Sequence, residues 1–133
     1  MLVVDTSALL KRYLAEQHRD EVVEIMDSES VWCASLLAVT EARIALCRIV
    51  DEQMLGEALG HLEADAAHLT LVPVDDMCLT RAAEIGCATG VRTLDALHLA
   101  AADRLPRPIK FLTLDHNQRS AAEALNFEVV LLS

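Results

Sequence analysis

Residues Thr93 to Ala102 read TLDALHLAAA. The leucines and alanines leave this segment no wide polar face, and a helix that is apolar almost all round usually lies inside a protein. Asp95 falls in the first turn of this helix, where little contact with water is expected. The segment therefore predicts a buried helix, and it identifies Asp95 as a carboxylate whose position needs an explanation.

The composition is typical of a compact protein without membrane spans. The 133 residues are 53% hydrophobic and carry a formal net charge of −10. That length suits one domain over residues 1–133, and the first residues lack a signal-peptide pattern. Charges interrupt every apolar run before ~18 residues, so no membrane-spanning helix and a cytoplasmic location are expected. The negative charge argues against a nonspecific nucleic-acid coat, which needs clustered Lys and Arg, and it fits a cation site or a basic protein partner.

Short apolar runs alternate with helical patterns along the whole chain. Strands are expected at Leu2–Asp5, Val31–Ala34, Leu69–Val74, Ile109–Leu114 and Phe127–Leu132. Helices are expected at Ser7–Glu16, Asp20–Asp27, Leu36–Val50, Asp51–His68, Asp75–Thr89, Thr93–Arg104 and His116–Leu125. Thr6 or Ser7 is suited to cap the first helix, Ser35 the third, and Gly90 can end the fifth. Five such strands separated by helices predict an α/β fold with a parallel sheet covered on both faces.

Acidic residues occur where such a fold places its functional sites, at the carboxyl ends of the strands. Asp5 ends the first strand and Asp115 ends the fourth. Glu41 lies on the apolar stripe of its helix, four residues after Leu37. Together with Asp95, these residues form a set of four carboxylates that we expect at one edge of the sheet.

Each acid also has an ordinary explanation. An Asp that follows a strand often caps the next helix, and an Asp in a first turn is favoured by the helix dipole. Glu41 could pair with Arg43 or Arg48. Several carboxylates within ~4–6 Å raise one another's pKa, however, and Mg²⁺ or Mn²⁺ would relieve that repulsion. The set therefore predicts metal-assisted hydrolysis of a nucleic-acid backbone by a metal-activated water.

Four blocks of the sequence resemble, in order and spacing, the signature blocks of PIN-domain ribonucleases, most closely the VapC-type toxins of bacterial toxin–antitoxin pairs. The blocks are VVDTSALLKRY, TEARIAL, RTLDALHLAAA and FLTLDHNQRSAAEAL. The resemblance implies a three-layer α/β/α sandwich with a central parallel sheet and an endoribonuclease that depends on Mg²⁺ or Mn²⁺. It also implies a homodimer, and a small antitoxin that blocks the groove, often by placing an Arg among the acids.

Carried over by position, the resemblance assigns roles to individual residues. Asp5 and Asp95 would be direct metal ligands, while Glu41 and Asp115 would hold metal-bound waters or a second ion. Ser7 would orient a carboxylate or a metal-bound water. Some relatives carry a further acid shortly after the last Asp, where this chain has the uncharged Asn117.

Basic residues flank each acidic motif and are candidates for binding the RNA phosphates, which fix the register of a nucleic acid without reading its sequence. They are Lys11, Arg12, Arg43, Arg92 and Arg119. Ordinary surface charge is the alternative for each. His98 follows Asp95 by three residues and is interpreted as a structural histidine rather than an acid or base. Aromatic residues make up only 3% of the chain, which argues against stacking of RNA bases.

The four cysteines, Cys33, Cys47, Cys78 and Cys87, lie in apolar runs without the spacing of a zinc site. We expect them to be buried as small hydrophobic residues. Two other functions stay open at this point. One is a catalytically inactive binding module with the same fold. The other is a receiver-like phospho-accepting module, which is disfavoured because Asp5 has no acidic neighbour and no lysine follows Asp115.

Overall fold

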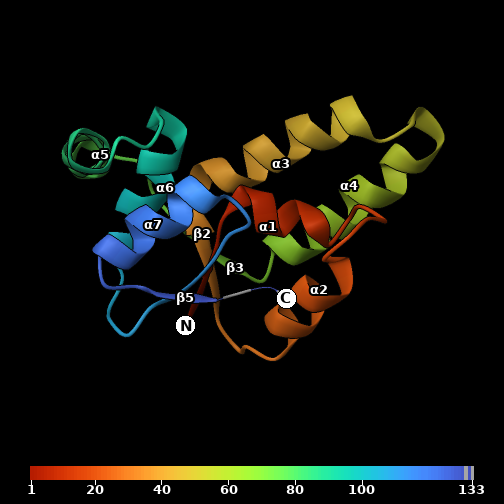
Figure 1. Ribbon diagram of the computed structural model, residues 1–133. Coiled ribbons are helices and arrows are strands. Elements are labelled where there is room, and N and C mark those ends of the chain that lie inside the picture. Colours follow the sequence, from red (N-terminus) through yellow and green to blue (C-terminus); the bar gives the residue numbers. More distant parts are fainter. Residues whose placement is uncertain (131, 133) are drawn as a thin grey trace.

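The computed structural model describes residues 1–130 and 132, and these form a parallel sheet with helices on both faces (Figure 1). The strands of this part of the chain are β1 (Leu2–Val4), β2 (Trp32–Ser35), β3 (Leu69–Val72), β4 (Lys110–Leu112) and β5 (Glu128–Val130). All neighbouring strands pair in parallel, in the order β3-β2-β1-β4-β5. The predicted α/β/α architecture is therefore confirmed.

The helices follow the predicted alternation with the strands. They are α1 (Thr6–Lys11), α2 (Arg19–Asp27), α3 (Leu36–Ile49), α4 (Glu52–Ala66), α5 (Asp76–Thr89), α6 (Thr93–Asp103) and α7 (His116–Ala124). In Figure 1, α5, α6 and α7 lie on one side of the sheet, while α1, α2 and the long pair α3 and α4 lie on the other. No helix in the described residues is both long and apolar enough to cross a membrane.

Alternation along β1 explains the two layers of core. Leu2 and Val4 point into one hydrophobic cluster, with α1 to α4, whereas Val3 points into the other, with α5 to α7. Successive side chains of a strand face opposite sides of the sheet, so this strand supplies both cores and all three of its residues are buried. Helix α6 lies deep in the second cluster, and its residues from Ala96 to Ala102 are all buried.

The strand order places the chain's topological switch point at β1. From β1 the chain proceeds to β2 on one side, while β4 pairs on the other side in the register Val4 with Leu112. The residues just after β1 and β4 therefore lie next to each other at the carboxyl edge, and the Asp5 amide donates to the Leu112 carbonyl at 3.0 Å. Ligands bind at such a point in open α/β sheets.

Several expected boundaries are wrong, and hydrogen bonding explains the largest error. Helix α1 ends at Lys11 rather than Glu16, because the Arg12 and Tyr13 amides already bond three residues back, in a tightened last turn. Its cap is Asp5, not Thr6 or Ser7. The third and fourth strands end earlier than expected, at Val72 and Leu112. The expected end of the last strand includes Leu131, which lies outside the described residues.

Two cysteine predictions and one leucine prediction are also wrong. Cys33 and Cys78 are buried as expected, but Cys47 and Cys87 are exposed, because each lies on the outward side of an amphipathic helix. Leu94 is 48% exposed, whereas Ala96 to Ala102 of the same helix are buried. The Ser35 cap of α3 and the Gly90 end of α5, at a positive φ of 76°, are as predicted.

Candidate active site

Asp5 is held by neutral hydrogen-bond donors at the end of β1. Its side chain is 4% exposed, and its Oδ2 accepts from the hydroxyls of Ser7 at 2.6 Å and Thr113 at 2.8 Å. The same oxygen caps α1 through the Ser7 amide at 3.4 Å. The capping explanation for Asp5 is thus correct, and it describes only part of what surrounds this carboxylate. Ser7, predicted to orient a carboxylate or a metal-bound water, is thus in contact with the Asp5 carboxylate.

Asp95 lies in the first turn of α6, partly buried, and is the acid that its surroundings perturb most clearly. Burial raises the pKa of Asp95, and the negative charges of Asp115 and Asp5 raise it further. Arg92 and His98 act in the opposite direction without reversing the shift. The nearest cation in an ion pair is Arg92, at 3.9 Å and with a side chain 85% exposed. The site therefore carries more negative charge than its cations offset.

Asp115 follows β4 and begins α7. Its Oδ1 accepts from the Asn117 amide at 2.9 Å, and its own amide donates to the Thr113 hydroxyl at 3.1 Å. Thr113 thus contacts both the Asp5 carboxylate and the Asp115 backbone, and it joins the ends of the two neighbouring strands. Asn117, at the position where some relatives carry an acid, contributes its backbone to this cap, and the residue itself is exposed.

Glu41 is paired with a histidine rather than with an arginine. Its Oε1 contacts His98 Nε2 and accepts from the Thr6 hydroxyl at 3.0 Å. Arg43 and Arg48, the partners considered from the sequence, are exposed, and among the described residues neither forms an ion pair with Glu41. The hydrogen bond from His98 is the main reason why the pKa of Glu41 is lowered, against the opposing effect of burial. Glu41 is therefore held as a carboxylate.

His98 connects Glu41 to the start of α3. It is 4% exposed, and its Nδ1 lies 2.9 Å from the Ser35 hydroxyl that also caps α3. Burial by itself would lower the pKa of His98, but the hydrogen bond to Glu41 and the charges of Asp5, Glu41 and Asp95 raise it overall. The structural interpretation of this histidine agrees with its position, which also places an imidazole with a raised pKa beside the acids.

The structure thus brings Asp5, Asp95 and Asp115 within electrostatic reach of one another, with Glu41 joined to them through His98. Within residues 1–130 and 132, no three His, Cys, Asp or Glu side chains form a ready-made metal site. The donor chemistry nevertheless fits Mg²⁺ or Mn²⁺, which bind carboxylate oxygens and are commonly held by one or two carboxylates together with water and substrate phosphates. Burial and the negative charges of Asp115 and Asp5 raise the pKa of Asp95, and a cation bound there would relieve this repulsion.

The predicted basic residues differ in what they contact. Arg92 lies next to Asp95 and is largely exposed, and Arg43 is also exposed. Arg119 is partly buried on α7. Lys11 pairs with Glu16, and Arg12 pairs with Asp27 at 3.1 Å and Asp65 at 2.9 Å. The structure brings Arg92 to the acids, and it does not bring Arg12 there.

Sequence reasoning did not identify Thr113 or Gln118, which both border Asp5. Gln118 is fully buried, and its place on α7, three and four residues before the buried Ala121 and Ala122, is the signal that could have revealed it. A polar side chain on the buried stripe of a helix needs a polar partner. The signal in Thr113 is weaker, because a threonine in a strand is common.

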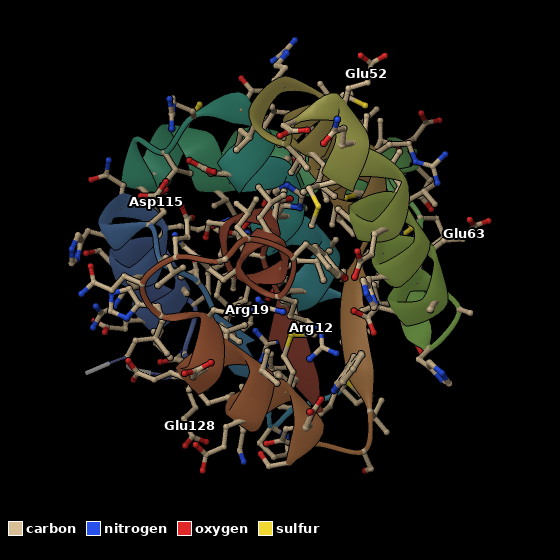
Figure 2. All side chains as sticks on the ribbon, turned by 90° about the vertical axis from the view of Figure 1, so that its right-hand side faces the viewer. Arg12, Arg19, Glu52, Glu63, Asp115 and Glu128 are labelled. Carbon is tan, nitrogen blue, oxygen red and sulfur yellow. The ribbon has the colours of Figure 1, made fainter. Side chains whose placement is uncertain are left out.

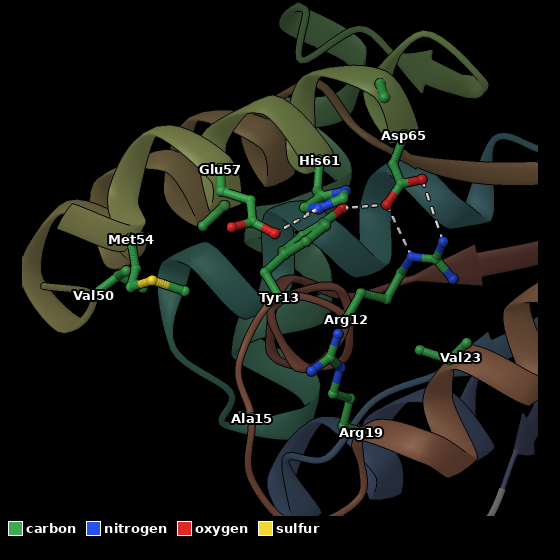
Figure 3. A pocket seen from close by; sticks show the side chains of 12 residues that line it. Arg12, Tyr13, Ala15, Arg19, Val23, Val50, Met54, Glu57, His61 and Asp65 are labelled. Atoms are coloured by element: carbon green, nitrogen blue, oxygen red, sulfur yellow. Dashed lines mark hydrogen bonds and ion pairs between the residues drawn. The ribbon is translucent and has the colours of Figure 1, made fainter. Parts of the chain in front are cut away.

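A second charged cluster lies on the other side of the sheet, between α1 and α4 (Figure 3). Asp65 accepts from the Arg12 guanidinium and from the Tyr13 hydroxyl at 2.7 Å, and Arg12 also lies over the Trp32 ring at 4.9 Å. Arg12, Tyr13 and Asp65 border a cavity of about 390 Å³, which Arg19 also lines. We call Arg12, Tyr13 and Asp65 the Asp65 cluster. Figure 2 shows Arg12 and Arg19 apart from Asp115, which lies beside α7.

Fold and site together define a parallel α/β protein whose acidic side chains gather at the switch point of the sheet. The model of the PIN domain matches residues 2–124, and the chain belongs to the PIN domain family. Two curated relatives come from Mycobacterium tuberculosis. Ribonuclease VapC47 of strain CDC 1551 / Oshkosh is 30% identical over 96% of this chain and 93% of its own length. Ribonuclease VapC46 of strain ATCC 25618 / H37Rv is 31% identical over 97% and 95%. The resemblance to VapC-type PIN proteins is thus confirmed.

Solved structures show the same fold at low sequence identity. VapC20 of Mycobacterium tuberculosis, a sarcin-ricin loop cleaving toxin, matches with a TM-score of 0.74 and 16% identity over 91% of this chain and 95% of that one. A toxin–antitoxin complex from Klebsiella pneumoniae matches at 0.73 and 13% over 98% and 97%. FitAcB from Neisseria gonorrhoeae matches at 0.71 and 17% over 97% and 96%.

Proposed function

We propose that this chain is an endoribonuclease toxin that depends on Mg²⁺ or Mn²⁺, that acts in the cytoplasm as a single domain of residues 1–133, and that a cognate antitoxin neutralises. The observation that carries the proposal is the group of three carboxylates at the switch point, Asp5, Asp95 and Asp115. Among the described residues, the only ion pair that any of them forms is the one between Arg92 and Asp95, at 3.9 Å. The ribonuclease relatives over nearly the full chain support the same reaction.

Asp5 and Asp95 are the proposed metal ligands, with Glu41 and Asp115 completing the negative edge. A divalent cation bound there lowers the pKa of a water and offsets the charge that develops on the phosphate. Ser7 and Thr113 hold Asp5 as an acceptor, and His98 holds Glu41 in its ionised form. These contacts fix the carboxylates before the cation arrives, so less freedom is lost on binding.

RNA binding is proposed to rest on exposed cations around this edge. Arg92 is the first candidate, because its guanidinium lies beside Asp95 and reaches into solvent. Arg43 and Arg119 are further candidates, while Lys11 and Arg12 would have to leave their present carboxylate partners. Few cations on a chain of net charge −10 would give a modest dependence of binding on salt.

Protein partners form the last part of the proposal. Solved toxin–antitoxin complexes with this fold support a small antitoxin, and the acidity of this chain suits a basic segment on that partner. A homodimer is supported by large apolar side chains that lie exposed on α3 and α5. These are Leu36, Ile44, Ile49, Met77 and Leu79. Light scattering of the purified chain measures the oligomeric state directly.

The experiment that tests the activity is cleavage of labelled RNA by the purified chain in EDTA, with Mg²⁺ or Mn²⁺ then added back. We expect no cleavage in EDTA and cleavage at discrete sites after addition. The cation should add about 1.4 kcal/mol to the free energy of unfolding at ten times the Kd, and the melting temperature should rise accordingly. A chain that shows neither cleavage nor a melting shift would be the inactive binding module considered above.

A further inference from the structure

Gln118 is a fully buried polar side chain next to the carboxylate of Asp5. It lies on the inner face of α7, and its amide is surrounded by three groups: the Asp5 carboxylate, the Thr113 hydroxyl and the Asp95 backbone carbonyl. A buried amide without hydrogen-bond partners destabilises a protein by about 1–3 kcal/mol. Burying an amide beside an acid is therefore a specific arrangement, and its orientation decides its role.

The neighbours of the amide determine which of its ends faces Asp5. If its oxygen faced Asp5, that oxygen would lie 2.8 Å from Oδ2 and 3.1 Å from Oδ1, although all three atoms are acceptors. The nitrogen would then have only a 3.4 Å contact with the Asp95 carbonyl. With its nitrogen toward Asp5, the amide directs one proton to the Asp5 carboxylate, shared between Oδ2 at 2.8 Å and Oδ1 at 3.1 Å, and the other to Thr113 at 3.1 Å. Donation to a carboxylate outweighs one long contact, so the second orientation holds.

This orientation also settles the hydrogen bond of Thr113. A threonine hydroxyl carries one proton, and that proton is directed to Asp5 Oδ2 at 2.8 Å. The Thr113 oxygen then accepts from Gln118 and from the Asp115 amide. Each donor at this site has an acceptor in this arrangement.

The two oxygens of Asp5 are consequently unequal. Oδ2 accepts from Ser7, Thr113 and Gln118 at 2.6, 2.8 and 2.8 Å, whereas Oδ1 has only the longer contact with Gln118 among the described residues. An ionised carboxylate has about four lone-pair sites, so Oδ2 is saturated and Oδ1 retains capacity. All these donors are neutral, and they therefore orient Asp5 without cancelling its charge, which an arginine would do.

We propose that Gln118 is a positioning residue that fixes the Asp5 carboxylate and leaves Oδ1 as the oxygen that binds the divalent cation. The inference rests on the proposed metal-dependent function and deepens it. Gln118 does not touch the RNA or the cation in this proposal. It acts through Asp5, and its loss should weaken cation binding more than it weakens the fold.

The test measures Mn²⁺ binding to the full chain by the loss of the free-ion electron paramagnetic resonance signal. Gln118→Met keeps the length and removes the donor, and we expect its Kd for Mn²⁺ to rise by about 10–100-fold, the range for groups that orient metal ligands. Phe127→Leu is the control for stability, because Phe127 is buried beside Phe111 on β4. It should lower the melting temperature and leave the Kd for Mn²⁺ within about twofold, as expected of a site without shared partners.

Two outcomes overturn the inference. One is a folded Gln118→Met that binds Mn²⁺ as the native chain does, and the other is a control that loses affinity to the same extent. Should Gln118→Met not fold, Gln118→Asn retains the amide but withdraws its nitrogen by one methylene, and native affinity in that variant also overturns the inference. If the native chain binds no Mn²⁺ and cleaves no RNA, the proposed function itself is wrong, so the two failures are distinguishable.

Discussion

The acidic edge of the sheet and the Asp65 cluster place carboxylates in opposite surroundings. Asp65 is matched by a guanidinium, a phenol and partial burial, with its side chain 16% exposed. The side chain of Asp95 is 17% exposed, nearly the same, yet its only ion pair among the described residues is with Arg92 at 3.9 Å, and the negative charges of Asp115 and Asp5 act on it. Equal burial with unequal compensation separates a carboxylate that holds the fold together from one that is available to a ligand.

The pKa values of the two regions follow the same division. Burial would lower the pKa of Arg12, but its bonds to Asp65 and Asp27 raise it overall, and burial together with Asp65 raises the pKa of Tyr13. Both partners of Asp65 therefore stay protonated and keep donating. At the acidic edge, the raised pKa of Asp95 shows that its charge is opposed rather than supported. Perturbation of that kind is typical of functional sites.

Removing the charge of Asp95 should produce the largest effect, and it tests most directly whether the acidic edge differs in role from the Asp65 cluster. We expect Asp95→Asn to lower RNA cleavage by at least about 100-fold, the scale for losing one electrostatic group in a catalytic site. In EDTA the same variant should melt at or above the native temperature, because a repelling charge is gone.

Asp76→Asn is the matched control for Asp95→Asn, since Asp76 is exposed and also lies in the first turn of a helix. It should cleave RNA at the native rate. Native cleavage by Asp95→Asn would mean that Asp95 is no ligand, and an unfolded Asp95→Asn would make it a structural cap.

Removing the charge of Asp65 should have the converse result. Asp65→Asn leaves Tyr13 without its anion and Arg12 with only the exposed Asp27. We expect the free energy of unfolding to fall by about 2–3 kcal/mol, slightly below the range for a fully buried pair. Urea unfolding measures this loss. RNA cleavage per folded molecule should stay native. A larger loss of cleavage than of stability would show that the two regions are not independent.

The placement of Asp5, Asp95 and Asp115 could be predicted because it depends on rules that operate along the chain. The carboxyl ends of the strands in a parallel sheet share an edge, and a carboxylate on an otherwise apolar helix is expected to face a polar site. Repeated short apolar runs likewise predicted the sheet. Strand and helix ends were less predictable, since they depend on where individual hydrogen bonds stop, as in the tightened turn after Lys11.

The contacts among side chains could not be predicted, because they join residues that are far apart in the sequence. His98 meets Ser35 across 63 residues and Glu41 across 57. Gln118 reaches Asp5 only because α7 packs against the end of β1. Periodicity tells which face of a helix is buried, but not which residue of another element lies opposite. For Glu41 the buried face was predicted, but its contacts are with His98 and Thr6 rather than with the arginines considered as the ordinary alternative.

Within the acidic edge, Glu41 differs from Asp95 because a hydrogen bond to His98 supports its negative charge. We expect His98→Gln to lower the stability in EDTA by about 1.5 kcal/mol, the value of a hydrogen bond between charged groups. The raised pKa of His98 makes its contribution complete below its ordinary pKa of 6.5, and this contribution is lost as the pH rises through the raised value.

The lowered pKa of Glu41 sets the other limit, since its contribution is present above its ordinary pKa of 4.5 and is lost as the pH falls through the lowered value. The difference between native chain and His98→Gln should therefore be largest between pH 4.5 and 6.5. Asp5 and Asp95, the other charges that act on His98, remain in both proteins. A difference that grows steadily toward alkaline pH would contradict this account.

The smallest effect should come from exposed arginines, and it compares the two regions at their surfaces. Arg92 lies beside Asp95, while the exposed Arg19 borders the cavity next to the Asp65 cluster. If RNA lies along the acidic edge, Arg92→Gln should reduce the slope of log binding against log salt by about one, and raise KM slightly. Arg19→Gln should change neither the slope nor KM, because Arg19 lies apart from the acidic edge (Figure 2). Equal effects of both variants would mean that RNA is drawn by overall charge, and the acidic edge would then no longer define where the substrate binds.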